Sequence, residues 1–123
     1  MSHIVTLKVE IKDAVAVRAA CQRLALPEPV QGTHKLFGGE ATGLAVKLTE
    51  WIYPVVCDTA SGQVKFDNFN GRWGDTAYLD RFLQAYAVCK AVSEAKRRGH
   101  SVSETAQADG SVKLTIQVNG GAA

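Results

Sequence analysis

The chain has 123 residues, of which 46% are hydrophobic and 21% are charged, and this balance predicts a folded domain with its own core and excludes intrinsic disorder. The formal net charge of +2 is too small to indicate a protein that binds nucleic acid or a membrane surface. The three cysteines are odd in number, whereas an exported disulfide scaffold has an even and denser set, so we expect reduced thiols and a cytoplasmic protein.

The sequence predicts neither a signal peptide nor a membrane span. The first residues contain no apolar stretch behind a basic start, so no signal peptide is expected. No apolar run approaches the ~20 residues that a membrane span needs. We therefore expect residues 1–118 to form a single domain, followed by a flexible tail over residues 119–123.

The first half of the chain predicts a strand, a helix and less clearly defined strands. Residues 4–11 alternate between polar and apolar side chains, as a half-buried strand does. Asp13 has the chemistry of a helix N-cap and predicts a helix over residues 14–25. This helix ends before Pro27, because the residue that precedes a proline disfavours the α region. Residues 35–37 and 41–48 are further strand candidates on either side of a glycine turn.

The second half predicts a hairpin, a long helix and another hairpin. Residues 55–58 and 63–67 are strands joined by a four-residue loop that contains glycine. Asp75 is a second N-cap, and apolar residues then recur at helical spacing over residues 76–98 before a glycine stop. Two alternating segments, 101–105 and 111–118, follow around an Asp-Gly turn. This element order predicts an α+β fold, with an antiparallel sheet and two helices on one face.

The loop over residues 66–78 is the most informative segment for function. Loops carry binding residues more often than strands do, and protein interfaces favour Trp, Tyr, Phe and Arg as anchors. We therefore predict a non-enzymatic accessory or binding protein that recognises a protein partner through an aromatic–Arg loop. The alternative that the aromatic side chains fill a core edge remains open. The candidate recognition residues are Asp67, Asn68, Phe69, Arg72, Trp73, Asp75 and Tyr78.

Two other classes of function are alternatives. A small-molecule or metal-assisted enzyme would use loop carboxylates together with the scattered cysteines and histidines, but no pair has CxxC or HxxxH spacing. We expect no catalytic residue, no cofactor and no structural zinc. Nucleic-acid binding is the third candidate, and the cations at 96–98 that would support it also suit a helix C-terminus. The carboxylates are Asp58, Asp67, Asp75 and Asp80, and the metal-ligand types are Cys21, Cys57, Cys89, His3, His34 and His100.

Several fragments together resemble the hypothetical chloroplast open-reading-frame-thirty-five family, which comprises small proteins of cyanobacteria, algal plastids and other bacteria. The fragments are residues 1–8 (MSHIVTLK), 53–58 (YPVVCD), 62–75 (GQVKFDNFNGRWGD), 82–86, 94–95 (EA), 99–102 (GHSV) and 109–117 (DGSVKLTIQ). The resemblance covers nearly the whole chain and implies a single cytoplasmic domain, without adding a catalytic residue. Genes of this family often lie beside that of a AAA-type ATPase, which implies such an ATPase as a candidate partner, with self-association as the other candidate.

Overall fold

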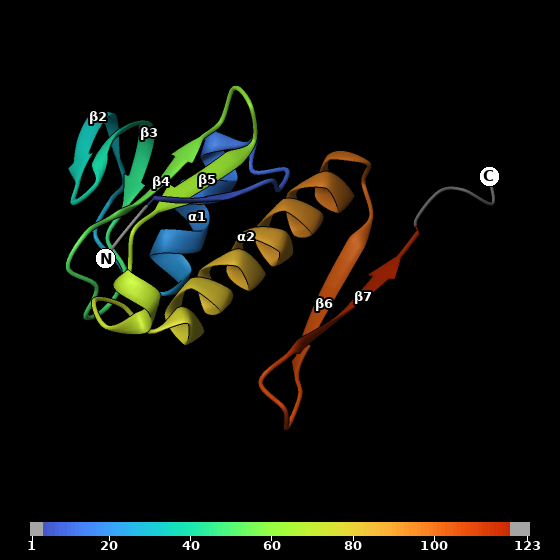
Figure 1. Ribbon diagram of the computed structural model, residues 1–123. Coiled ribbons are helices and arrows are strands. Elements are labelled where there is room, and N and C mark those ends of the chain that lie inside the picture. Colours follow the sequence, from blue (N-terminus) through green and yellow to red (C-terminus); the bar gives the residue numbers. More distant parts are fainter. Residues whose placement is uncertain (1–3, 119–123) are drawn as a thin grey trace.

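The computed structural model describes residues 4–118. It contains a five-stranded antiparallel sheet, two helices on one face of that sheet, and a separate two-stranded ribbon (Figure 1). The strand order of the larger sheet is β1-β5-β4-β3-β2, and the ribbon pairs β6 with β7. This architecture confirms the predicted α+β fold. The elements are β1 (Val5–Leu7), α1 (Ala14–Arg23), β2 (Val30–Leu36), β3 (Gly39–Val46), β4 (Val55–Asp58), β5 (Gln63–Phe66), the short 3-10 helix η1 (Phe69–Gly71), α2 (Thr76–Arg97), β6 (Ser101–Ala106) and β7 (Val112–Gln117).

The predicted first strand is shorter in the structure than the alternating pattern suggests. Pairing of β1 with β5 ends at Leu7, which lies opposite Val64. The residues after Leu7 have no partner strand, because β5 begins at Gln63 and the segment before it is the turn that connects β5 to β4. The apolar side chains nevertheless continue into the core, because Ile11 is buried and its backbone N–H donates to the Gly62 carbonyl at 3.0 Å.

The helix that follows begins where the sequence predicts and ends two residues earlier. Asp13 Oδ1 accepts hydrogen bonds from the amides of Val15 and Ala16 at 3.0 and 3.1 Å, which fixes the start of α1. At the other end, Ala25 adopts a left-handed conformation with φ 55°, and the Leu26 amide donates to the Cys21 carbonyl at 2.8 Å. A left-handed residue at this position terminates a helix.

Strands β2 and β3 are better defined than the sequence indicates. The candidates over 35–37 and 41–48 become β2 and β3, which pair from Val30 opposite Ala45 to Leu36 opposite Gly39. The hairpin of β4 and β5 matches the prediction closely, with Asp58 opposite Gln63 at its turn. The ribbon of β6 and β7 also forms as expected, but it packs beside α2 and does not join the larger sheet (Figure 1).

The long helix α2 connects the sheet to the ribbon. Asp75 caps its start, since Asp75 Oδ1 accepts from the Ala77 amide at 2.9 Å. Gly99, with φ 77°, follows its end, where glycine adopts this backbone at little cost. Within residues 4–118, no helix combines the length and apolar content that a crossing of the bilayer demands.

Most of the core lies between the helices and one face of the sheet. Phe82 of α2 and Val17 of α1 are fully buried there against strand residues such as Val46 and Val64. The helix-free face of the sheet carries a smaller apolar cluster of Leu36, Ala41 and Val56, against which Ile4 and Tyr53 pack. Tyr53 also contacts Trp73, so it connects this second cluster to the aromatic rings described below.

A polar network joins the start of α1 to the middle of α2. Tyr86 Oη accepts from the Asp13 amide at 3.1 Å, and Lys90 Nζ lies 3.1 Å from Asp13 Oδ2. Lys90 also pairs with Glu94 at 3.2 Å. Burial by itself raises the pKa of the Asp13 carboxyl, but hydrogen bonds from the Ala16 amide and Lys90 outweigh burial and lower that pKa overall.

Removing the Asp13 carboxylate is expected to destabilise the protein in a pH-dependent way. Asp13→Ala should lower the free energy of unfolding by about 1–2 kcal/mol at neutral pH, because the N-cap and the ion pair are both lost. The pKa of Asp13 is lower in the folded state than its ordinary 3.8, so its stabilisation is present above that value and disappears as the pH falls through the folded-state pKa. Urea unfolding of both proteins at neutral and acidic pH measures this difference.

Asp80→Ala on the exposed side of α2 is the control for this prediction, with an expected change within about 0.5 kcal/mol. If the Asp13 variant lost the same free energy of unfolding at acidic pH as at neutral pH, the negative charge of Asp13 would not be the source of the stabilisation.

Candidate functional site

Trp73 lies at the centre of a group of aromatic rings. The Phe69 ring stacks on it, with centroids 4.7 Å apart and planes inclined by 24°. Phe37 and Tyr53 meet Trp73 edge-on, at centroid distances of 5.1 and 5.7 Å. Stacked and edge-on pairs at such distances are favourable because ring faces and edges carry opposite partial charge. We call Phe37, Tyr53, Phe69, Arg72 and Trp73 the aromatic patch.

Three separate segments build this patch. Phe37 lies in the turn between β2 and β3, and Tyr53 lies in the segment that leads into β4. Phe69, Arg72 and Trp73 belong to the loop between β5 and α2. The backbone ties two of these segments together, since the Ile52 amide donates to the Trp73 carbonyl at 2.9 Å.

The loop between β5 and α2 has an unusual backbone. Phe69 and Asn70 both adopt left-handed conformations, with φ of 49° and 52°. For residues other than glycine this conformation costs about 1–2 kcal/mol each. Asn68 holds the loop in place, because its carbonyl accepts from the Trp73 amide at 2.9 Å and its side-chain Nδ2 donates to the Gly74 carbonyl at 3.1 Å. Strain that the surrounding structure maintains is common at binding sites.

The patch is partly exposed on the surface of the protein. Phe37 is 59% exposed and the adjacent Ile52 is 61% exposed, whereas Phe69 and Trp73 are half-buried. Arg72 is exposed, and its guanidinium carbon lies 5.3 Å from the centre of the Phe69 ring, which is cation–π geometry. The result is an apolar surface with a cationic group at its margin.

Three other predicted recognition residues organise the loop and its junction with α2. Asp67 is only 1% exposed and its Oδ1 accepts from the Phe69 amide at 3.3 Å. Asn68 is buried and organises the loop as described above. Asp75 caps α2 with its side chain and accepts a hydrogen bond from Trp51 Nε1 at its carbonyl, at 3.0 Å. These three residues therefore shape the loop, while Phe69, Arg72 and Trp73 form its outer part.

Sequence reasoning did not include Phe37 or Ile52 among the site residues. A large apolar side chain directly before the Gly38-Gly39 turn was a signal for Phe37, because the tip of a hairpin seldom lies over a core. Its contact with Trp73 joins positions 36 residues apart in the chain, which no local pattern encodes.

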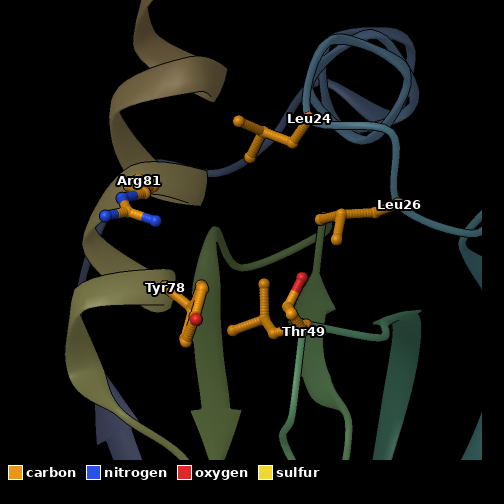
Figure 2. Close-up of a pocket in the computed structure, with 6 residues that line it drawn as sticks. Leu24, Leu26, Thr49, Tyr78 and Arg81 are labelled. Atoms are coloured by element: carbon orange, nitrogen blue, oxygen red, sulfur yellow. The ribbon is translucent and has the colours of Figure 1, made fainter.

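Tyr78 lines a different feature, a small cavity beside α2 (Figure 2). The Arg81 guanidinium carbon lies 5.4 Å from the centre of the Tyr78 ring. The cavity has a volume of about 100 Å³, well below the several hundred Å³ of typical small-molecule sites. Figure 2 shows side chains from the segment after α1 and from α2 turned toward this space. The lining residues are Leu24, Leu26, Leu48, Thr49, Tyr78 and Arg81.

The thiols lack the properties of catalytic nucleophiles. Burial raises the pKa of Cys21 to about 11 and that of Cys57 to about 12. The pKa of Cys89 is also raised, first by burial. These thiols are therefore protonated at neutral pH, whereas a nucleophilic cysteine requires a lowered pKa.

The other enzyme and metal residues are dispersed. His34 Nε2 donates to the carbonyl of Val30 in its own strand, at 2.9 Å, and His3 lies outside the described residues, as does the predicted tail. Asp58 caps its own turn by accepting from the Ala60 amide at 3.1 Å. Across residues 4–118 no three His, Cys, Asp or Glu side chains gather closely enough to hold a metal ion.

The cations near the end of α2 are partly compensated by acids. Glu94 pairs with Lys90 at 3.2 Å and with Arg97 at 3.4 Å. Paired charges contribute less attraction to a phosphate backbone than free ones. This arrangement agrees with a role for these cations at the helix C-terminus.

Comparison with known proteins adds no further residue to the site. No protein-family model, curated protein or solved structure matches this chain. The candidate site therefore rests on the geometry of the aromatic patch itself.

Proposed function

We propose that this protein is a non-enzymatic accessory or binding protein that recognises a protein partner through the aromatic patch. The observation that carries the proposal is the packing of three rings around Trp73, with Phe37 left largely exposed. Rings of this type bury large areas with few rotatable bonds, so ordering them on binding costs little entropy.

The chemistry of the patch suggests what the partner presents. An apolar side chain of the partner would contact the exposed parts of Phe37 and Ile52. An acidic group beside it would pair with Arg72, whose planar guanidinium suits a carboxylate. Aromatic and Arg side chains dominate the binding energy of many interfaces.

The family resemblance provides the first partner to test, a AAA-type ATPase. The enzyme alternative receives less support, because the pKa of each cysteine is raised. Of the predicted carboxylates, Asp58 and Asp75 serve as caps and Asp67 is buried. Nucleic-acid binding receives less support as well, since Lys90 and Arg97 of α2 pair with Glu94.

The test substitutes two residues of the aromatic patch together, Arg72 at its margin and Trp73 at its centre. Arg72→Ala with Trp73→Ala should weaken binding to the partner by about 2 kcal/mol or more, which is roughly a 30-fold rise in the dissociation constant. The partner is first captured from native extract and identified by mass spectrometry, with the AAA-type ATPase tested directly as a purified protein. Isothermal titration calorimetry with the purified partner then measures the change.

A matched control removes one Arg and one exposed apolar side chain elsewhere. Arg18→Ala with Val15→Ala on α1 should leave the affinity within about threefold, since both side chains are exposed on a helix outside the patch. Partner binding that survives the Arg72 and Trp73 double substitution in a folded protein would refute the proposal. Phe37→Ala gives a second measurement of partner binding, because it removes an exposed ring of the patch that belongs to the turn between β2 and β3 rather than to the loop.

A further inference from the structure

The ribbon of β6 and β7 is unusual because it stands apart from the larger sheet (Figure 1). A two-stranded ribbon alone is marginally stable in water. Here one of its faces lies toward the helices, as the ion pair of Arg23 in α1 with Glu104 in β6 indicates. That face is incompletely covered, because Ile116 is 44% exposed and the following Val118 is 63% exposed.

The hydrogen-bond pattern of the ribbon identifies its open edge. The Gln107 amide donates to the Ser111 carbonyl at 2.8 Å, and the same register continues along both strands. Hydrogen-bonded and non-hydrogen-bonded pairs alternate in antiparallel ribbons. The N–H and C=O groups of Val112, Leu114 and Ile116 therefore point away from β6, and no strand within residues 4–118 pairs with them.

We propose that the open edge of β7 pairs with β7 of a second copy of this chain, in antiparallel orientation about a two-fold axis through Leu114. The product is a four-stranded sheet with the α2 helices of both copies on the same face. Unpaired edges of this kind are templates for further strand addition, and a two-fold axis makes the interface self-complementary.

The side chains of β7 favour this register. With Leu114 opposite its own copy, Val112 lies opposite Ile116, so every pair on the helix side is apolar. On the other face Lys113 lies opposite Thr115, so the two lysines do not oppose each other. Apolar cross-strand pairs stabilise a sheet, whereas directly opposed like charges destabilise it.

The outer edge of β6 is less suited to the same pairing. The corresponding two-fold arrangement would set Glu104 opposite Glu104 of the second copy. Glu104 is also engaged by Arg23, which the pairing would disturb. This contrast selects β7 as the edge that associates.

The first test measures the oligomeric state of the intact chain by sedimentation velocity across a range of concentrations. The unmodified protein should form a dimer, and Ile116→Lys should raise the dimer dissociation constant by at least about tenfold, because a charge replaces an apolar cross-strand partner. Val15→Lys is the matched control, since Val15 is an exposed apolar residue on α1, and it should remain dimeric.

A second test remains informative even if the lysine substitution disturbs the ribbon. Hydrogen-bonded antiparallel pairs have Cα atoms about 5.5 Å apart, within the range that a disulfide spans. In a Cys89→Ser background, Leu114→Cys should therefore yield a covalent dimer on mild oxidation. Ser103→Cys, on the exposed face of β6, should not.

The outcomes separate this inference from the proposed function. A chain that stays monomeric at all concentrations overturns the inference, and so does a dimer that Ile116→Lys leaves unchanged and Leu114→Cys does not cross-link. The Arg72 and Trp73 double variant should dimerise normally, because its substitutions are confined to the aromatic patch.

Discussion

Phe82→Ala is expected to lower the free energy of unfolding by about 3–5 kcal/mol, the cost of removing a fully buried aromatic ring. Phe82 has no exposed surface and lies in the core between α2 and the sheet. The surrounding strand and helix side chains collapse only partly into the space left behind, so lost burial and a residual cavity both contribute. Chemical denaturation followed by far-ultraviolet circular dichroism measures the change.

Phe37→Ala is the matched control, since it makes the same chemical change at a side chain that is mostly exposed. Its expected cost is about 0.5–1.5 kcal/mol, the value of an edge-on contact with Trp73. Equal losses for the two variants would contradict the division between a buried core at Phe82 and an accessible patch at Phe37.

Gly74→Ala is expected to cost about 3 kcal/mol, the upper part of the range for overpacking a core. A Cβ atom at Gly74 would overlap the ring carbons of Trp51. Trp51 is buried, and its Nε1 donates a hydrogen bond to the Asp75 carbonyl at the start of α2. The ring therefore has little freedom to move. The substitution should also displace the neighbouring Trp73 and weaken partner binding.

A double-mutant cycle checks the cause. In a Trp51→Leu background the indole ring is absent, and the cost of Gly74→Ala should fall below about 1 kcal/mol. The same cost in both backgrounds would show that the overlap with Trp51 is not the reason. Thermal unfolding of the four proteins provides the comparison.

The local elements of this protein are encoded in short stretches of its sequence. The hairpin of β4 and β5 follows from two β-branched segments around a turn, and α2 follows from a cap at Asp75, an apolar repeat and a stop at Gly99. The Asp13 cap likewise predicted the start of α1. Periodicity, capping and turn chemistry act over a few residues, so they can be read without knowing which elements meet.

The tertiary structure alone decided which side chains of the loop over 66–78 face outward. Asp67 and Asn68 belong to a polar, turn-rich segment, yet both are buried, and Asn68 is hydrogen-bonded within the loop to the Trp73 amide and the Gly74 carbonyl. Similarly, β6 and β7 alternate like the other strands but form a separate ribbon, since α2 directs them away from the sheet (Figure 1). The aromatic patch also depends on Phe37, which reaches Trp73 only through the pairing of β2 with β3. Such contacts join distant positions, and the free energy that selects them comes from burial of whole faces rather than from local sequence patterns.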